Sequence, residues 1–460
     1  MKKNSSFIRF AAVVLAAFLS AQFQLRAAEL NVLELTEVDS AALNFSSSAA
    51  NFSQNVNGRT YQRSPVSSFK GYQYATYYDG NRNVCLGRRK LPSGPWEVIR
   101  FPDYSITSHD SHNITALGIC AGDGTIHLAF DHHKDPLNYR VSSVGVATNP
   151  DAVSWSASLF GSVTDELGSV GRLTDVTYPS FFQAPNGNLM LFYRFGGSGT
   201  GDGMIYEYDA ISSDWSPGMG KFISRSGTYN GAVSSNSTSR NPYINGISYG
   251  GDRLHASWGW RESSGGSQFN HDLHYAYSDD HGRTWRNSGG TQIGVTGSSF
   301  ISIHSSDLIV APIPQNIGLS NQYTHYAYPD GSCHVVVAHR EGGTGSVRYH
   351  HYWRNAAGTW SSEVLPLSGS RPKLVGDENR ELFLVYVSGN TLRVAKGTPN
   401  ASETAWSWSS IHSQSDRSEG GEGQIDVARW EADRILSVYG QEDPPSNGSS
   451  TALHVLDYQV

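Results

Sequence analysis

The stretch Asp123-Gly-Thr-Ile-His-Leu-Ala-Phe-Asp-His-His133 combines a turn, an apolar strand and a polar strand end. Similar stretches recur along the chain, at residues 72–81, 186–195, 251–261, 330–340, 378–386 and 432–439. A four-stranded antiparallel sheet with its turns needs about 40 to 50 residues, so one sheet per repeat accounts for most of the chain. The seven repeats therefore predict an all-β fold, a seven-bladed β-propeller.

The composition agrees with many short strands joined by turns. Of the 460 residues, 48 are glycine and 18 are proline, and long helix-forming runs are rare. With 38% hydrophobic and 16% charged residues, the chain is not disordered as a whole. The cysteines Cys85, Cys120 and Cys333 allow at most one disulfide, so the core must hold the fold together. A formal net charge of −7 argues against a nucleic-acid partner.

The N-terminus has the pattern of a secretory signal peptide. Two lysines and an arginine precede the apolar stretch 10–19, and the small residues Ala27 and Ala28 follow it. We predict a signal peptide over residues 1–28 and a single catalytic propeller domain over 29–460. The apolar stretch is too short to cross a bilayer, so we expect a secreted protein, extracellular or periplasmic, that has no membrane partner.

One hairpin carries a second propeller signature. Ser278-Asp-Asp-His-Gly-Arg-Thr-Trp285 matches the Asp-box pattern Ser-x-Asp-x-Gly-x-Thr-Trp. We expect Asp280 to accept hydrogen bonds from turn N–H groups and Trp285 to pack between sheets, which is a structural role. A pair of sandwiches or a β-helix would need more uniform repeats or a proline-rich linker, and the sequence has neither.

The repeats also predict where a site lies, because equivalent positions of neighbouring blades converge in a propeller. Aligning the repeats places four residues level at the polar ends of apolar strands, namely His132, Arg194, Trp260 and His339. A second row precedes the turns, in the tripeptides Ser111-His112-Asn113, Thr177-Tyr178-Pro179, Asn241-Pro242-Tyr243 and Ser370-Arg371-Pro372. We expect histidines, tyrosines and an arginine from these rows to meet at one mouth.

Such a set of side chains suits β-elimination on a uronic-acid polysaccharide. Arg194 can neutralise the uronate carboxylate and so acidify the C5 proton. His112 or Tyr178 can take that proton while the other protonates the departing O4, and no cofactor is needed. A single histidine at a strand end is usually structural, but a buried arginine needs an anionic partner, and none is adjacent to Arg194 in the sequence.

At these residues the sequence resembles the secreted ulvan lyases built on a seven-bladed propeller, relatives of other Asp-box (BNR-repeat) proteins. The resemblance is carried by four motifs, Asp110-Ser-His112-Asn113, Phe130-Asp-His-His133, Thr177-Tyr-Pro179 and Phe192-Tyr-Arg194. It implies cleavage between sulfated rhamnose and a glucuronic or iduronic acid, which leaves an unsaturated uronyl end. The acidic polysaccharide would be the partner, and we expect a monomer.

The resemblance also implies roles for individual residues. His112 would be the base, Tyr178 the acid, or the base for the other C5 epimer, and Arg194 the carboxylate neutraliser. His132 would position the substrate, and Tyr243 and Arg240 are looser matches. We also expect substrate-binding roles for three residues at or beside the aligned strand ends: His133, Trp260 and His339.

A structural zinc or calcium ion is a further implication of the resemblance. His255 and His274 would face each other if residues 263–266 turn a hairpin, and Cys333 opens the corresponding strand of the next blade. We therefore consider a His/His/Cys zinc site, for which the sequence offers no evident fourth ligand.

Two other functions use the same fold. A sialidase-like glycoside hydrolase needs three arginines on a carboxylate, which Arg194, Arg261 and Arg340 could imitate, together with a Tyr/Glu pair. A non-catalytic sugar-binding propeller needs only exposed aromatic rings, for which the candidates are Trp258, Trp260, Tyr243 and Tyr249.

Overall fold

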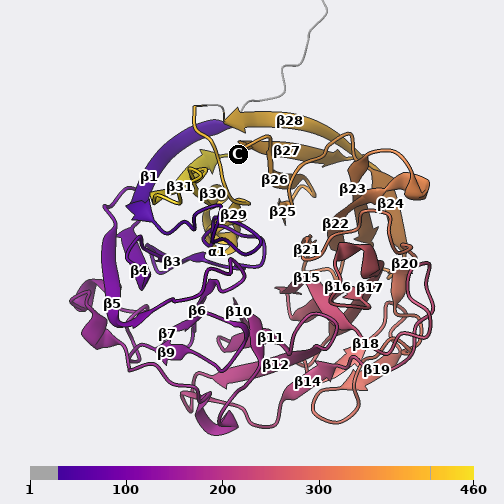
Figure 1. The fold of residues 1–460 in the computed structure, drawn as a ribbon, viewed down its shortest axis with the longest axis horizontal. Helices are drawn as coiled ribbons and strands as arrows, with labels where there is room; N and C mark the ends of the chain where they lie inside the picture. Colours follow the sequence, from indigo (N-terminus) through magenta and orange to yellow (C-terminus); the bar gives the residue numbers. More distant parts are fainter. Residues whose placement is uncertain (1–29, 415) are drawn as a thin grey trace, which may run out of the picture.

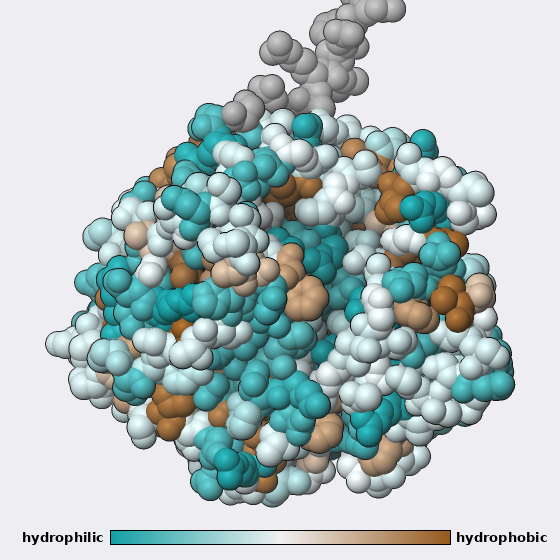
Figure 2. Space-filling view, in the orientation of Figure 1, coloured by the Kyte–Doolittle hydropathy of each residue, from teal (hydrophilic) through white to brown (hydrophobic). Residues whose placement is uncertain are grey.

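The protein folds into seven antiparallel sheets arranged as blades around a central axis (Figure 1). The computed structural model describes residues 30–414 and 416–460, and the predicted signal peptide lies outside them. The predicted seven-bladed β-propeller is confirmed. Figure 2 shows that hydrophilic residues surround a hollow near the middle of one face.

The strands of the first four blades, from the axis outward, have the following bounds. Blade 1 contains β2 (Val66–Phe69), β3 (Tyr72–Tyr78), β4 (Asn83–Lys90) and β5 (Glu97–Ser105). Blade 2 contains β6 (Thr115–Ile119), β7 (Ile126–Phe130) and β9 (Tyr139–Val141). Blade 3 contains β10 (Val176–Gln183), β11 (Leu189–Phe195) and β12 (Asp202–Asp209), with β8 (His133–Asp135), β13 (Asp214–Trp215) and β14 (Gly220–Ile223) at its edges. Blade 4 contains β15 (Asn241–Gly250), β16 (Arg253–Arg261) and β17 (Asn270–Ser278), with β18 (Thr284–Arg286), β19 (Gln292–Val295) and β20 (Ile309–Ala311) outside.

The remaining three blades are regular four-stranded sheets. Blade 5 contains β21 (Thr324–Ala327), β22 (Cys333–Arg340), β23 (Val347–Arg354) and β24 (Trp360–Val364). Blade 6 contains β25 (Lys373–Gly376), β26 (Leu382–Ser388), β27 (Thr391–Pro399) and β28 (Trp406–Gln414). Blade 7 contains β29 (Gln424–Ile425), β30 (Ile435–Gln441), β31 (Thr451–Gln459) and β1 (Asn31–Ala42). The helices are α1 (Val427–Asp433) and the short 3-10 turns η1 (Pro150–Ala152), η2 (Ala157–Leu159), η3 (Gly168–Val170), η4 (Ser267–Phe269) and η5 (Glu341–Gly343).

Each of the seven sequence repeats forms the second strand of a blade, counted from the axis. These strands are β3, β7, β11, β16, β22, β26 and β30. Sheets of neighbouring blades cover both faces of these strands, which explains why they read as continuous apolar runs instead of alternating ones. In β26, for example, all residues except the last are buried.

The hairpin with the Asp-box pattern is organised around one carboxylate. Asp280 accepts hydrogen bonds from the backbone N–H groups of Thr284 (2.8 Å) and Arg283 (3.2 Å) and from the Thr284 hydroxyl (2.7 Å). The ring of Trp285 is fully buried, and its indole N–H donates to the carbonyl oxygen of Gly282 at 3.1 Å. The carboxylate of Asp280 therefore stabilises the turn, as expected of a structural residue.

The three cysteines are buried and free, so no disulfide links any two residues of the described chain. Within that part, no helix is long and apolar enough to span a membrane.

The two ends of the described chain close the ring. Strand β1 pairs with β31 over its whole length, so the last blade combines strands from both ends. A buried charge cluster lies behind this closure. Asp457 of β31 accepts hydrogen bonds from Arg89 of blade 1 at 2.6 Å, and from Arg429 (2.7 Å) and Ser437 (2.6 Å) of blade 7. The carboxylate thus ties the last blade to the first.

Replacement of Asp457 by alanine should destabilise the ring strongly, because two buried guanidinium groups would lose their shared carboxylate. We expect a loss of about 3 to 5 kcal/mol in the free energy of unfolding, measured by chemical denaturation. Asp165→Asn, which breaks the exposed pair with Arg172, is the control and should cost less than about 1 kcal/mol. Equal effects of the two substitutions would contradict the closing role of Asp457.

Candidate active site

The predicted site residues come together where innermost strands begin and second strands end. Thr177, next to Tyr178 in β10, pairs with Arg194 at the end of β11. Thr177 also pairs with His133, because the short strand β8 leaves blade 2 and joins the sheet of blade 3. Two blades thereby bring histidine, tyrosine and arginine side chains to one place.

One carboxylate holds two histidines. Asp110 contacts His112 Nδ1 through Oδ1 at 2.6 Å and His133 Nδ1 through Oδ2 at 2.7 Å. The centroids of the two imidazole rings lie 4.4 Å apart. An ionised carboxylate only accepts hydrogen bonds, so each Nδ1 carries a hydrogen. In each ring the Nε2 atom is the nitrogen that does not contact Asp110.

The protonation states follow from burial and from this contact. Burial raises the pKa of Asp110, but the hydrogen bonds from His112 and His133 together lower it by more. The pKa of Asp110 is therefore well below its usual range. For His112, burial is the largest cause, and together with the nearby Arg194 it outweighs the hydrogen bond to Asp110 and lowers the pKa to about 4. His112 is therefore neutral at neutral pH, as a general base must be.

Tyr178 faces the two histidines. Its ring centroid lies 5.8 Å from that of His112 and 5.9 Å from that of His133, and it stacks on Tyr61 at 5.3 Å. Its φ angle of 54° lies in the left-handed region, which is strained for a bulky residue and is typical of functional sites. Burial and the phenol of Tyr243 raise its pKa well above the ordinary value, although Arg194 opposes the shift. Tyr178 is thus protonated and can donate.

Arg194 is a buried cation without a counter-charge. Its side chain is 1% exposed, and its guanidinium lies 4.9 Å from the ring centroid of Tyr178 and 5.0 Å from that of Tyr243. Nε donates to the carbonyl oxygen of Gly196 at 3.1 Å, whereas Nη1 and Nη2 have no hydrogen-bond partner among the described residues. Unsatisfied donors of a charged group are costly when buried, so a ligand that carries a carboxylate would gain both hydrogen bonds and charge neutralisation.

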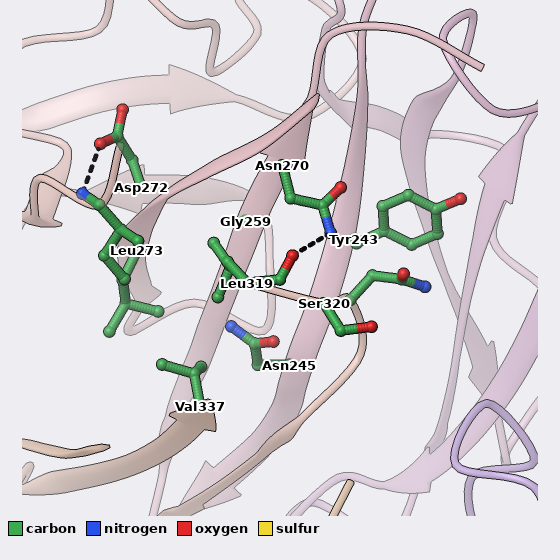
Figure 3. A pocket seen from close by; sticks show the side chains of 11 residues that line it. Tyr243, Asn245, Gly259, Asn270, Asp272, Leu273, Leu319, Ser320 and Val337 are labelled. Carbon is green, nitrogen blue, oxygen red and sulfur yellow. Dashed lines mark hydrogen bonds between the residues drawn. The ribbon is translucent and has the colours of Figure 1, made fainter. Parts of the chain in front are cut away.

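Tyr243 lies between two arginines. Arg261 stacks on its ring at 4.5 Å and donates to its hydroxyl at 3.2 Å. Although burial alone raises the pKa of the Tyr243 phenol, Arg194 and Arg261 lower it to about 8. Behind this tyrosine lies a cavity of about 10 Å³, room for one water molecule, which Asn245, Asn270 and other residues line (Figure 3).

A larger polar pocket adjoins the histidines. It has a volume of about 410 Å³, within the range of ligand sites, and Asp110 and His133 form part of its wall. Carboxylate and amide groups of Asp131, Asn113 and Asn138 complete it, and such groups suit the hydroxyls of a sugar.

Phe52 stands over the histidines from the loop that follows β1. Its ring is 77% exposed, and its centroid lies 4.1 Å from that of His112 and 6.3 Å from that of His133. Its φ angle of 71° is again left-handed. An exposed aromatic ring held in a strained conformation beside the candidate base is well placed to contact a substrate.

Two predicted binding residues, His132 and Trp260, are buried away from the site. In each case the next residue in the sequence lies at the site. His132 is fully buried, and its Nε2 accepts the backbone N–H of Asn138 at 2.7 Å. Trp260 is also fully buried, in the core of blades 2 to 4. His133, which is also a predicted binding residue, and Arg261 lie at the site, because successive side chains of an extended segment point to opposite sides.

Two other predicted binding residues have partners within the protein. Arg240 is fully buried and forms hydrogen bonds to both carboxylate oxygens of Glu262, at 2.8 and 3.0 Å. His339 stacks on His350 with ring centroids 3.6 Å apart, and its Nε2 contacts the hydroxyl of Tyr352 at 2.9 Å. Neither side chain contacts the cluster around Asp110 in the part of the chain that the structure covers.

The expected pairing of His255 with His274 is wrong. The hairpin forms, but His255 pairs with Tyr277 and His274 pairs with Trp258. Because His255 and Trp258 are three residues apart on β16, the two histidines leave opposite faces of the blade. The described residues therefore do not bring His255, His274 and Cys333 together as metal ligands.

One other group has the spacing of a metal site within residues 30–414 and 416–460, namely Asp110, His112 and His133. Its contacts are hydrogen bonds in which both Nδ1 atoms point at the carboxylate, so their lone pairs are not available to a metal ion. This donor set does not fit a metal in the present arrangement.

The sequence reasoning gave no role to Asp110, Tyr61 and Phe52. Asp110 stands two residues before His112, a spacing that could have suggested a carboxylate–histidine pair. Tyr61 and Phe52 lie in the loop before β2, which has no strand periodicity to place it. No sequence signal was available for these two residues.

A spectroscopic titration tests the charge pattern of the site. One tyrosine should ionise near pH 8, seen as phenolate absorbance, and Tyr243→Phe should remove this transition. Arg261→Met should move it to higher pH, because one of the two cations that stabilise the phenolate is lost. If no tyrosine of the wild-type protein ionises below about pH 9, the two arginines do not act on Tyr243 as described.

Comparison with known proteins shows what the chain is similar to. An ulvan lyase, long isoform, of an Alteromonas species is 28% identical over 269 residues, which cover 49% of this chain and 26% of the relative. An ulvan lyase, long isoform, of Alteromonas sp. strain LOR is 22% identical over 443 residues, which cover 86% of this chain and 40% of the relative. The chain thus spans less than half the length of these two relatives.

Two solved structures share the architecture. The polysaccharide lyase Uly1 superposes with a TM-score of 0.73 at 17% identity, over 93% of this chain and 99% of the other. A PL25 ulvan lyase bound to -[GlcA(1-4)Rha3S]- superposes with a TM-score of 0.64 at 11% identity, over 92% and 95%. At such identities the likeness establishes the propeller fold. The model of a BNR repeat-containing family matches residues 72–366, a span that includes Asp110, His112, Tyr178 and Arg194, and the chain belongs to this family.

Proposed function

We propose that the protein is a polysaccharide lyase that cleaves ulvan by β-elimination at the uronic acid. The observation that carries this proposal is the unpaired, buried guanidinium of Arg194 beside a neutral histidine and a protonated tyrosine. Elimination needs these three functions: a cation for the carboxylate, a base and an acid.

The geometry suggests an order of events. Arg194 binds the uronate carboxylate and stabilises the negative charge that develops when C5 loses its proton. The Nε2 atom of His112 takes this proton, the electron pair forms a double bond between C4 and C5, and the bond between C4 and O4 breaks. The hydroxyl of Tyr178 gives its proton to O4. The products are an unsaturated uronyl end and a new hydroxyl end, so atoms and charges balance.

Asp110 positions the base in this scheme. It accepts the Nδ1 hydrogen of His112, fixes the tautomer with Nε2 free, and stabilises the imidazolium that forms when the ring is protonated. His133, held by the same carboxylate, presents a second Nε2 that can accept a hydrogen bond from a sugar hydroxyl.

The relatives support the choice of substrate. The two similar curated proteins are named ulvan lyases, and one similar structure holds a glucuronic acid–rhamnose 3-sulfate fragment. We therefore propose a sulfated rhamnose–uronic acid polymer as the partner. The signal-like N-terminal sequence supports secretion, which places the enzyme where such a polymer is found.

The two competing functions have less support. Of the four rings expected to bind sugar in a non-catalytic propeller, Trp258, Trp260 and Tyr243 are buried. A sialidase would need a Tyr/Glu pair beside its arginines, whereas the carboxylate of this cluster is Asp110, which His112 and His133 occupy.

Activity on ulvan tests the proposal directly. The protein should produce the ultraviolet absorbance of an unsaturated uronate, and His112→Ala, Tyr178→Phe and Arg194→Ala should each lower kcat/KM by about 10²-fold or more. His304→Ala, at an exposed histidine outside the cluster, is the control and should keep full activity. Saturated reducing ends would indicate a hydrolase, and binding without cleavage would indicate a lectin; either result overturns the proposal.

Phe52 should contribute to substrate binding and not to proton transfer. We expect Phe52→Ala to raise KM about 3- to 10-fold with little change in kcat, because an aromatic contact is worth about 0.5 to 1.5 kcal/mol. Phe52→Tyr keeps the ring and should keep the wild-type KM. An unchanged KM in the alanine variant would show that the ring does not touch the substrate.

A further inference from the structure

The axis of the propeller contains a second cavity, separate from the histidine cluster, with both apolar and polar side chains in its wall. It has a volume of about 180 Å³ and lies between the inner strands β10, β15, β21, β25 and β29. Arg63 and Lys373 line it together with neutral residues, and no acidic side chain of the described chain forms part of its wall. The cavity therefore has two basic side chains and no acidic one among the described residues.

Both cations donate only to neutral oxygen atoms. Arg63 donates to the carbonyl oxygens of Asn245 (2.9 Å) and Ile244, and Lys373 Nζ donates to the carbonyl and hydroxyl oxygens of Thr60 at 2.9 and 3.0 Å. Neither lies within ion-pair distance of a carboxylate in the chain as described. Arg63 and Lys373 are half-buried, and two neighbouring cations without a counter-charge among the described residues repel each other.

The pKa values of the two groups reflect the cost of charging both side chains. Burial and the charge of Arg63 lower the pKa of Lys373 well below its usual value, and burial lowers that of Arg63 to about 10. A bound anion would oppose these shifts, because it favours the charged form of each group. The acid that acts on Lys373, Glu422, is already held by Arg371 at 2.7 Å and by the backbone N–H of Thr60 at 2.8 Å. Glu422 therefore does not supply the missing counter-charge.

The wall of the cavity also offers neutral donors. The side-chain oxygen of Asn245 accepts the backbone N–H of Tyr323, so the amide NH₂ group remains to donate. The hydroxyl of Thr324 accepts the backbone N–H of Leu374, which leaves its hydrogen to donate. Cations and neutral donors around one space form the usual surroundings of a bound anion.

We propose that this cavity binds a small inorganic anion, of the size of chloride or sulfate, between Arg63 and Lys373. The proposal does not depend on the function assigned to the histidine cluster. The anion would neutralise the two cations that fix the segment 59–64 to the inner strands. This segment carries Tyr61, which stacks on Tyr178 and His112, so the anion would hold one wall of the active site in place.

Chloride NMR tests the proposal on the full protein in a buffer that lacks other small anions. The wild-type protein should broaden the chloride line, and Lys373→Met and Arg63→Met should each lose most of the excess width. Lys70→Met, at an exposed lysine, is the matched control and should broaden the line as the wild type does. Addition of sulfate shows which anion the site takes: displacement of chloride would indicate an oxyanion site, and no displacement would indicate a halide site.

Crystals of the wild-type protein soaked in bromide give a second readout that needs no variant. The anomalous signal of bromide should appear between the Lys373 ammonium and the Arg63 guanidinium. Absence of this signal would overturn the proposal, and so would equal line broadening by the wild type and by both cavity variants.

Discussion

The closed ring is the constraint on which the rest of the structure depends. A propeller blade has its place only because the blades on either side fix it, and here β1 completes the last sheet by pairing with β31. The carboxylate of Asp457 joins arginines of the first and last blades behind this pairing. With the ring closed, the inner strand ends of neighbouring blades are held at fixed separations, and side chains far apart in the sequence can form one site.

The fixed positions of the blades separate the acidic and the basic groups of the site. Asp110 lies with the two histidines, whereas Arg194 and Arg261 lie around Tyr243, and no carboxylate of the described residues pairs with either arginine. The fold thus maintains an unneutralised cation next to a neutral base. A uronate is a ligand that resolves this imbalance, because it brings one negative charge to the arginine and an acidic C–H bond near the histidine.

The sequence was sufficient to predict the architecture and the meeting of His112, Tyr178 and Arg194. The fold was predictable because the second strand of each blade is buried on both faces and so repeats as a continuous apolar run. The prediction of individual binding residues was wrong where a shift of one residue along a strand decides which side chain faces the site. His132 was predicted together with His133, although only His133 lies at the site, and Trp260 was predicted where the next residue, Arg261, lies there. A composition pattern cannot tell which side chain of a strand end faces inward. The contribution of Phe52 and Tyr61 was not predictable, because a long loop has no periodicity that places it beside blade 2.

The central claim is that Arg194 binds a carboxylate of the substrate. The most direct measurement is the affinity of the Tyr178→Phe variant for ulvan oligosaccharides, compared with the same oligosaccharides after reduction of their carboxyl groups to alcohols. The account predicts binding at least about 10-fold weaker for the reduced form, because the guanidinium then stays unpaired. Equal affinity for the two forms would contradict it.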